Sequence, residues 1–444
     1  MRRNMLPRLV EWARSRDHKP LLLCGARQTG KTYLLNELAK TRFGADHVRF
    51  DLERDARARQ VFEQEIEPAV LVQRLSQAAH KQINPETTLL ILDEIQASNR
   101  ALASLKYFRE DMPRLRVATA GSLLGVAVSQ QGFTMPVGKV ETLTLRPMGF
   151  DEFLYAMGEG GLVGEIRECY REAKPFYLHD AMMECFWQYL LVGGMPEAVD
   201  EFVSNGDYDA VRNLQSDIID LYAADMAKYA TPVETARIRD TWNSIPSQLA
   251  KENRKFQYKL VKSGGRAAVY SSAISWLLSA GLVERCRRIS DGRVPLAMHE
   301  DESAFKVYMS DTGLLAARSE LDSALALDAG YRRRIDLGGI VENYVAQALA
   351  ANGVPLRYWT SGNTAEVDFV IQTEGATVGV PVEVKSSDNT RSRSLSVYRG
   401  KYGPDESIRL STKNFGLDGG IHSVPLYAAF CIGGHGPTAR TSST

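Results

Sequence analysis

The stretch that decides the fold is Pro20-Leu-Leu-Leu-Cys-Gly25-Ala-Arg-Gln-Thr-Gly30-Lys31-Thr32. It predicts a short apolar strand over 21–24, a loop spaced Gly-x-x-x-x-Gly-Lys-Thr, and a helix that starts at Thr32. The two glycines allow the backbone to wrap a polyphosphate and to turn several N–H groups toward it. The helix adds the positive end of its dipole. The stretch therefore predicts a loop that binds a nucleoside triphosphate, ATP or GTP.

The side chains of this loop have separate expected roles. Lys31 supplies a point charge for the outer phosphates, and Thr32 supplies a hydroxyl for Mg²⁺. The expected cofactors are thus ATP and Mg²⁺. The residues expected to contact the nucleotide are Gly25, Ala26, Arg27, Gln28, Thr29, Gly30, Lys31 and Thr32.

A second apolar strand ends in two carboxylates, in Leu89-Leu-Ile-Leu-Asp93-Glu94-Ile-Gln96. At the carboxyl end of the strand, Asp93 can hold the water shell of the magnesium ion. Glu94 is placed to polarise the attacking water. The alternative is a pair of solvated carboxylates at a strand end, which the preceding phosphate loop disfavours.

The Asp-Glu pair resembles the division of P-loop ATPases that has an additional strand and a catalytic glutamate. The resemblance implies that another strand lies between the loop strand and the Asp-Glu strand and ends in a polar sensor. Arg116-Val-Ala-Thr-Ala-Gly121-Ser122 fits that strand, with Ser122 as the sensor of the γ-phosphate and Thr119 as the weaker choice. An arginine that completes catalysis stays unassigned among Arg27, Arg109 and Arg146.

Composition sets the broad class of the protein. The 444 residues are 44% apolar and 24% charged, which is ordinary for a globular protein of two or three domains. Basic and acidic residues balance at 54 each, so nucleic-acid binding would need local patches. No apolar run is long enough for a membrane span. Five scattered cysteines favour a reducing cytoplasm over a disulfide framework or a zinc site.

The pattern along the chain predicts three domains and a tail. Apolar runs at 21–24, 48–52, 88–93, 116–120 and 140–145 alternate with helical segments, which favours a parallel sheet covered on both faces. We expect the domain boundaries to be 1–155 for the ATPase core, 156–335 for a helical region, 336–432 for a C-terminal α/β domain, and 433–444 for a flexible tail.

Together these motifs resemble prokaryotic AAA-type ATPases that carry a C-terminal domain of unknown function with a nuclease-like core. The resemblance rests on the stretches quoted above, on Leu145-Arg-Pro-Met-Gly-Phe-Asp-Glu-Phe-Leu154 and on Gly193-Gly-Met-Pro196-Glu-Ala-Val. It implies an AAA-type parallel sheet, and self-association into a homo-oligomer stays open.

A basic segment lies in the middle of the chain. Residues 251–293 hold ten Lys and Arg against three acids. A helix over 266–279, ended by Gly281 and followed by a basic hairpin from Val283, predicts a winged-helix module at about 235–315. The charges could neutralise the phosphates of DNA or RNA. Alternatively the module is an internal lid or protein contact, because a charge run is usually a solvated face.

The C-terminal domain carries a second set of carboxylates, on Ala365-Glu-Val-Asp368-Phe-Val-Ile and Val380-Pro-Val-Glu383-Val-Lys385. Glu383 and Lys385 point to one face of a strand because side chains alternate. Two carboxylates and a lysine that meet on adjacent strands can bind divalent ions and activate water.

With a preceding helix glutamate, this pattern is similar to the PD-(D/E)xK nuclease superfamily, whose restriction-endonuclease-like fold it implies. Glu342, Asp368, Glu383 and Lys385 fill its positions, with the three carboxylates as metal ligands and Asp368, Glu383 and Lys385 as catalytic residues. Val367 stands where many members have proline. The alternative is an ordinary polar strand pair, because Glu-Val-Lys is a common β pattern.

The sequence therefore predicts an intracellular, cytoplasmic Mg²⁺-dependent ATPase joined to a nuclease-like domain that acts on nucleic acid. In this interpretation the ATP state would reposition the C-terminal domain as a switch. Two alternatives remain open: a nucleotide-dependent DNA-binding regulator, and a protein-interaction switch whose nuclease-like domain is inactive.

Overall fold

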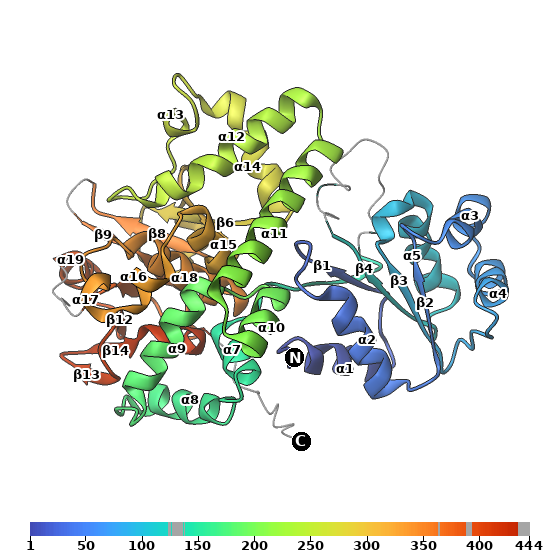
Figure 1. Cartoon of the computed structure of the whole chain (residues 1–444), viewed down its shortest axis with the longest axis horizontal. Coiled ribbons are helices and arrows are strands. Elements are labelled where there is room, and N and C mark those ends of the chain that lie inside the picture. Colours follow the sequence, from blue (N-terminus) through green and yellow to red (C-terminus); the bar gives the residue numbers. More distant parts are fainter. Residues whose placement is uncertain (123–125, 127–135, 137, 363–364, 388–392, 434–444) are drawn as a thin grey trace. The chain divides into compact units, whose positions relative to one another are not determined.

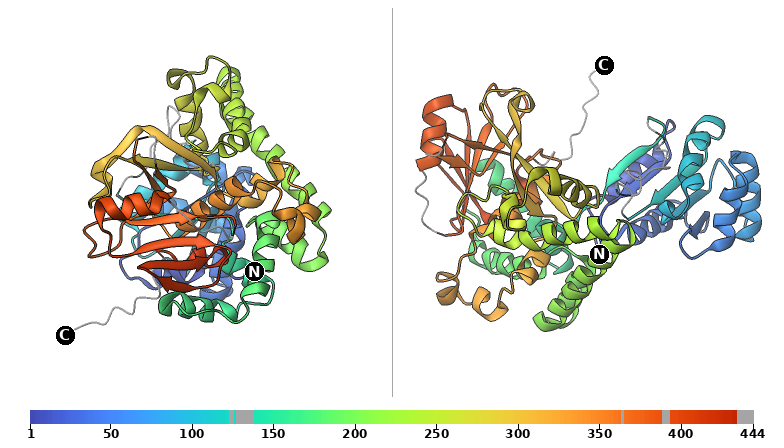
Figure 2. Two further views of the ribbon diagram at one scale, coloured as in Figure 1. Left: turned by 90° about the vertical axis from the view of Figure 1, so that its left-hand side faces the viewer. Right: turned by 90° about the horizontal axis from the view of Figure 1, so that it is seen from above.

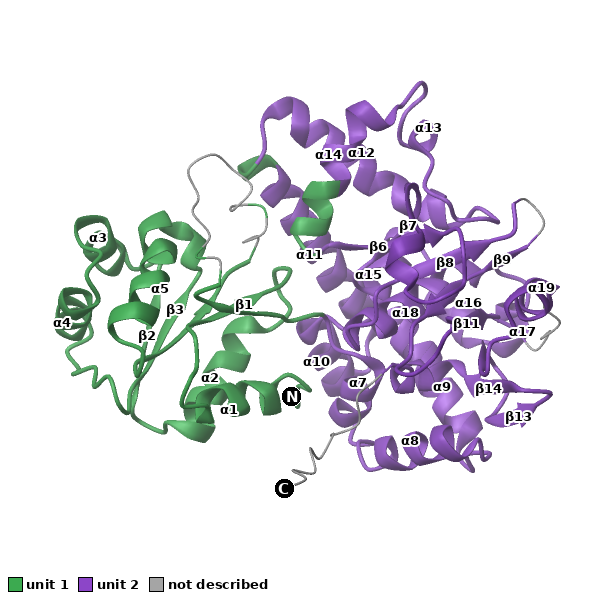
Figure 3. Cartoon of the chain, turned by 180° about the vertical axis from the view of Figure 1, so that it is seen from behind, with its two compact units in different colours: residues 1–146, 227–229, 275–281 green, residues 147–226, 230–274, 282–444 purple. Residues whose placement is uncertain are grey.

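The computed structural model of the chain divides into two compact units (Figure 3). Unit 1 comprises residues 1–146, 227–229 and 275–281, and unit 2 comprises residues 147–226, 230–274 and 282–444. The residues that the structure describes are 1–122, 126, 136, 138–362, 365–387 and 393–433.

Unit 1 is built on a five-stranded parallel sheet in the order β2-β3-β4-β1-β5 (Figure 1). The order confirms the expectation that β4 lies between the loop strand β1 and the Asp-Glu strand β3. The strands are β1 (Leu21–Cys24), β2 (His47–Asp51), β3 (Leu89–Asp93), β4 (Arg116–Ala120) and β5 (Glu141–Thr144).

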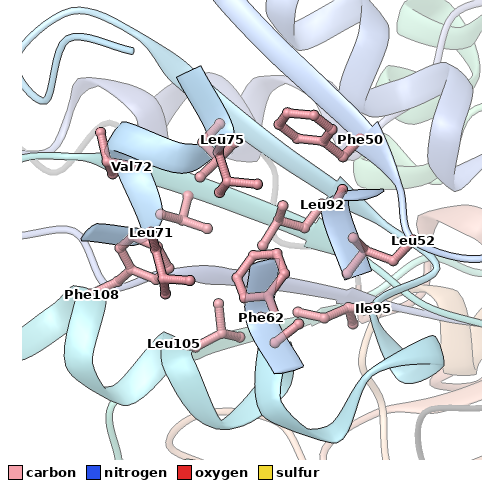
Figure 4. Close-up of a cluster of buried hydrophobic side chains, with 14 of the residues drawn as sticks. Phe50, Leu52, Phe62, Leu71, Val72, Leu75, Leu92, Ile95, Leu105 and Phe108 are labelled. Atoms are coloured by element: carbon pink, nitrogen blue, oxygen red, sulfur yellow. The ribbon is translucent and has the colours of Figure 1, made fainter. Parts of the chain in front are cut away.

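Helices cover both faces of this sheet, as near-continuous apolar strands require. Leu21 and Leu23 of β1 pack in one core cluster with helices α1 and α2, whereas Leu22 packs on the other face with α3, α4 and α5. Figure 4 shows side chains of this second cluster, among them Phe62 and Leu105. The helices are α1 (Leu6–Arg14), α2 (Lys31–Arg42), α3 (Ala56–Gln64), α4 (Pro68–Ala78) and α5 (Asn99–Asp111).

Unit 2 begins with a run of helices and contains two mixed sheets. None of the helices described in the chain is both long and apolar enough to cross a bilayer. The helices up to the hairpin are α7 (Phe150–Ala156), α8 (Leu162–Glu172), α9 (His179–Val192), α10 (Pro196–Asn205), α11 (Tyr208–Lys228), α12 (Pro232–Leu249), α13 (Tyr258–Val261) and α14 (Ala267–Ser279). The last residues of α11 and of α14 belong to unit 1. Those after it are α15 (Thr312–Arg318), α16 (Ser323–Leu327), α17 (Ala329–Arg332), α18 (Gly338–Ala351) and α19 (Arg393–Tyr402).

The signature at Gly193-Gly194 is a structural junction of unit 2. The Gly194 N–H donates to the buried Asp311 carboxylate (2.7 Å), and the Gly194 carbonyl accepts from the Met148 N–H (2.7 Å). Gly193 has φ +73°, and a Cβ there would collide with the Asp311 side chain. The two glycines are therefore explained by close packing of the backbone.

The expected basic hairpin is present. Strand β6 (Val283–Ile289) pairs antiparallel with β7 (Glu300–Met309). However, β6 also pairs in parallel with β8 (Arg357–Thr360), so the hairpin belongs to a four-stranded sheet β7-β6-β8-β9. Helices α12 to α14 precede the hairpin in the order that a winged helix requires. The winged-helix identity stays a prediction.

The last sheet has the order β10-β11-β12-β14-β13 and is coloured orange to red in Figure 2. Its three inner strands are parallel, and the two edge strands are antiparallel to them. Of the tail expected over 433–444, all but residue 433 lies outside the described residues. The remaining strands are β9 (Glu366–Val367), β10 (Phe369–Ile371), β11 (Val380–Val384), β12 (Ser407–Ser411), β13 (Gly416–Asp418) and β14 (Ile421–Pro425).

Candidate functional site

The phosphate-binding loop connects β1 to α2, as its sequence predicts. Gly25 (φ +145°) and Gly30 (φ +90°) adopt backbone angles that favour glycine. A Cβ at Gly25 would collide with the carbonyl oxygen of Leu145, so only glycine fits there. Gln28 is also left-handed (φ +63°). This backbone opens a concave loop at the N-terminus of α2, where an anion is favoured.

Lys31 is buried at the base of the loop. Its ammonium donates to the carbonyl oxygens of Gly25 (3.0 Å) and Ala26 (2.6 Å). Burial lowers the pKa of Lys31 to about 8, although the carboxylates of Glu94 and Asp93 oppose the shift. A desolvated ammonium of this kind gains most when a polyphosphate supplies the missing negative charge.

Thr32 and Asp93 lie in contact, as the predicted magnesium site requires. The Thr32 hydroxyl donates to Asp93 Oδ2 (2.7 Å), and the Arg49 guanidinium of β2 lies 2.7 Å from the same oxygen. A threonine hydroxyl and a carboxylate are hard oxygen ligands of the kind that Mg²⁺ takes. These two residues therefore fit a magnesium ion.

Glu94 follows β3 in a strained left-handed conformation (φ +49°, ψ +48°). Its carboxylate accepts from the Ser122 hydroxyl (3.0 Å) and from the Gln96 amide. Arg27 Nε donates in turn to Ser122 Oγ (3.3 Å). The predicted catalytic, sensor and loop residues thus form one hydrogen-bonded chain. A left-handed backbone such as that of Glu94 costs about 1–3 kcal/mol, and such strain is typical of functional sites.

The structure shows different surroundings for the other sensor candidate, Thr119, and for the candidate catalytic arginines Arg109 and Arg146. Thr119 donates to the Leu21 carbonyl within the sheet (2.9 Å), so Ser122 rather than Thr119 lies at the site. Arg109 pairs with Asp17 and donates to the His18 carbonyl (3.0 Å), which assigns it a structural contact. Burial lowers the pKa of Arg146.

A cleft of about 970 Å³ in unit 2 brings together the four residues of the nuclease resemblance. Glu342 lies on α18, and Asp368 lies between β9 and β10. Glu383 is the last residue but one of β11, and Lys385 directly follows that strand. Asp368 thus lies where the chain passes from one sheet to the other. All four line the cleft.

Glu342 is fully enclosed by donors. Its Oε1 accepts from the Lys306 ammonium (3.0 Å) and from the Tyr308 hydroxyl, and its Oε2 accepts from Arg254 Nη1 (2.5 Å). Burial by itself raises the pKa of Glu342, but the charges of Lys306 and Arg254 outweigh burial and hold it at about 2. Glu342 is therefore an ionised carboxylate inside the protein.

The hydrogen-bond and charge partners of Asp368 and Glu383 differ from those of Glu342. Asp368 Oδ2 accepts from the Val384 N–H (2.8 Å). Burial, with the charges of Glu342 and Glu383, raises the pKa of Asp368 well above its ordinary value. Lys385 Nζ lies 2.8 Å from Glu383 Oε1, which confirms that the two side chains share a face.

These donors do not form the complete metal site that the nuclease resemblance implies. Across the described residues, no group of three or more His, Cys, Asp and Glu side chains is arranged to hold a metal ion. Asp368 and Glu383 are carboxylates of the required kind, whereas both oxygens of Glu342 already accept from cationic groups. The three carboxylates line one cleft but are not a ready metal cage.

The basic segment is partly neutralised by its own sheet. Arg288 pairs with Asp301 across β6 and β7, and Arg287 lies 3.5 Å from Glu300. The exposed basic residues are Lys251, Lys255, Lys259, Lys262, Arg266 and Arg293. The first two line the cleft, and Arg293 pairs with Asp291.

Sequence reasoning missed several residues that the structure places at these sites. Arg49 contacts Asp93, and Gln96 contacts Glu94. Lys306 is fully buried between Phe305 and Val307 on β7. A single lysine inside an apolar strand is the signal that could have found it, because an unpaired buried ammonium is too costly to persist.

Three family models match parts of the chain. Residues 17–154 match an AAA domain. Residues 183–325 and 337–429 match two different domains of unknown function (DUF8612 and DUF4143). The third match coincides with the domain that carries Asp368 and Glu383.

Two curated relatives align over a short segment. Both are described as uncharacterized proteins, one from Mycobacterium tuberculosis and one from Mycobacterium bovis, and each is 33% identical over 90 residues. The alignment covers 20% of this chain and 20% of each relative.

The similar solved structures are distant. A Walker-type ATPase of Pyrococcus abyssi is 15% identical with a TM-score of 0.44, covering 72% of this chain and 95% of that one. The Aeropyrum pernix ORC1 protein in complex with DNA is 16% identical with a TM-score of 0.30, covering 74% and 92%. With such scores, the assignment rests on the family model and the site geometry. Residues 17–154 of this chain are thus similar to an AAA domain.

Proposed function

We propose that unit 1 binds ATP with Mg²⁺ and hydrolyses it. The observation that carries the proposal is the meeting of three strand ends: the β1 loop, Asp93-Glu94 after β3, and Ser122 after β4. Because the carboxyl ends of parallel strands lie at one edge of a sheet, ligands of open α/β folds bind there.

In this proposal each residue has one task. The loop N–H groups and Lys31 bind the phosphates, and Thr32 and Asp93 hold Mg²⁺, which offsets charge on the phosphate oxygens. Glu94 accepts a proton from the attacking water, and Ser122 orients Glu94 through their 3.0 Å hydrogen bond.

The test compares ATP turnover of the wild type with that of Glu94→Gln. We expect turnover to fall by about 100-fold or more, with nucleotide binding retained, since only the general base is lost. Glu86→Gln, at an exposed glutamate paired with Arg114, is the matched control. The proposal fails if the wild type hydrolyses ATP no faster than Glu94→Gln.

A second candidate function belongs to the cleft of unit 2: nuclease-like action on nucleic acid, coupled to the ATPase. It is supported by the presence of Asp368, Glu383 and Lys385 in one cleft with the exposed Lys251 and Lys255. The order helix α18, strands β8 to β11, helix α19 and strand β12 also agrees with the nuclease resemblance.

A panel of DNA and RNA substrates with Mg²⁺ or Mn²⁺ separates the alternatives. A nuclease cuts, and Lys385→Ala abolishes cutting without changing ATP binding. A DNA-binding regulator binds with steep salt dependence and does not cut. A protein-interaction switch does neither, and ATP changes only its affinity for a partner.

A further inference from the structure

Two cations and a hydroxyl enclose the Glu342 carboxylate. Arg254 reaches it from the loop after α12, and Lys306 and Tyr308 reach it from β7. The Glu342 and Lys306 side chains are only 2% and 0% exposed. A buried ion pair persists only when hydrogen bonds satisfy its polar atoms, and both Glu342 oxygens accept such bonds.

The charges of this group are balanced inside the protein. The Lys306 ammonium lies 3.0 Å from Glu342 and 2.6 Å from Glu366, so it bridges the two carboxylates. Arg254 supplies the second positive charge. A divalent ion at Glu342 would add two positive charges next to two existing ones, and these like charges repel at short range.

The backbone of the loop shows that Arg254 is held in place. Arg254 has a left-handed conformation (φ +44°), which is uncommon for a residue with a side chain. Its Nε also donates to the Leu249 carbonyl at the end of α12 (3.2 Å). Lys251 and Lys255, on either side of Arg254, line the cleft.

We propose that Glu342 is a structural anion rather than a metal ligand: Lys306 and Arg254 take the place of a divalent ion there. Through Arg254, Glu342 positions the loop that carries Lys251 and Lys255 along the cleft. Binding of a metal ion in the cleft then depends on Asp368 and Glu383. The proposal goes beyond the activity proposed for the cleft, because it holds whether or not the cleft cuts nucleic acid.

The test uses the full chain without nucleotide and has two readouts, the Tm in EDTA and Mn²⁺ binding followed by electron paramagnetic resonance. We expect Glu342→Gln and Lys306→Met each to lower the Tm by about 5–15 °C, since each leaves a buried charge with one partner fewer. The double variant should lower the Tm by less than the sum of the two single decreases, because the two side chains are in contact.

We expect the Mn²⁺ affinity of Glu342→Gln to stay within about twofold of the wild type. If the wild type binds no Mn²⁺, the Tm in EDTA decides: a Tm lowered by Glu342→Gln supports the proposal, and an unchanged Tm overturns it. The proposal is overturned if Glu342→Gln weakens Mn²⁺ binding about tenfold or more and leaves the Tm in EDTA unchanged, as loss of a metal ligand would.

Tyr308→Phe is the second variant, for the case in which Glu342→Gln does not fold. It removes one donor from Glu342 and keeps the ring. Unchanged Mn²⁺ affinity supports the proposal. Mn²⁺ binding about tenfold tighter than in the wild type overturns it, because Tyr308 would then be competing with a metal for Glu342.

Discussion

The Thr32 hydroxyl donates to Asp93 Oδ2 over 2.7 Å, although 61 residues separate them in the chain. Thr32 belongs to the first turn of α2, and Asp93 is the last residue of β3. Strand β4 lies between β1 and β3, so the contact spans two strand positions of the sheet. The Arg49 guanidinium contacts the same carboxylate, so one oxygen of Asp93 binds side chains of both α2 and β2.

Asp93→Asn tests this arrangement. The amide keeps the shape of the side chain and removes the charge that offsets Arg49 and, in our proposal, Mg²⁺. We expect the affinity for Mg²⁺-ATP to fall by about 10–100-fold, while the affinity for ATP in EDTA changes little. Titration calorimetry with and without Mg²⁺ measures both. Asp17→Asn, at an exposed ion pair with Arg109, should leave both unchanged.

The lowered pKa of Lys31 predicts that nucleotide binding takes up a proton. Burial lowers the pKa to about 8 in the folded protein, and a bound polyphosphate raises it again. Below pH 8 Lys31 is already charged, so affinity is steady. Above pH 8 it must be protonated on binding, so affinity should fall by up to about tenfold per pH unit.

Calorimetry at pH 8.5 in two buffers of different ionisation enthalpy measures this uptake directly. Lys31→Met should show none. The stability of the protein should also depend on pH through Lys31. Because the pKa of Lys31 is lower in the folded than in the unfolded protein, the free energy of unfolding should rise between pH 8 and 10.5. A wild type with no proton uptake at pH 8.5 contradicts the prediction.

Gly25→Ala should damage the loop. The added Cβ would meet the Leu145 carbonyl oxygen, and the backbone angle of Gly25 is costly for alanine. We expect a loss of about 1–3 kcal/mol of stability and a large loss of nucleotide affinity. Gly164→Ala, on helix α8 with open space around the site, should be neutral or stabilising. Equal effects of the two substitutions would refute the packing argument.

The two lysines that line the cleft should contribute more to nucleic-acid binding than exposed lysines outside it. If Lys251 and Lys255 contact phosphates, the double alanine variant should reduce the slope of log affinity against log salt by about 2. Lys259 and Lys262 are also exposed but do not line the cleft, so their double alanine variant is the matched control. Equal loss from both pairs would mean that the cleft is not the binding surface. Fluorescence anisotropy at several salt concentrations measures the slopes.

Local patterns predicted much of this structure. The five strands of unit 1 lie within one or two residues of the apolar runs, and the helix expected over 266–279 is α14. Strand alternation placed Glu383 and Lys385 on one face, and their 2.8 Å contact agrees. These features depend on residues close in sequence, where backbone periodicity decides which side chains face the same way.

Charge partners between distant segments could not be read in the same way. The charge balance of residues 251–293 predicts that Arg287 and Arg288 are available for phosphates, but the structure pairs them with acids of β7. Glu342 was expected to hold a metal, and its nearest charges are Lys306 and Arg254. Each pairing depends on which strand or loop packs beside which.

The sequence by itself determined the phosphate loop, the Asp-Glu strand and the α/β alternation of unit 1, because each is written in neighbouring residues with a fixed spacing. The sequence also favoured Ser122 over Thr119. Tertiary structure alone decided that Ser122 hydrogen-bonds Glu94, and that Lys306 lies buried against Glu342. The physical reason is that a hydrogen bond or a buried charge pair is satisfied across space. Its partners can stand anywhere along the chain that the packing brings within about 3 Å.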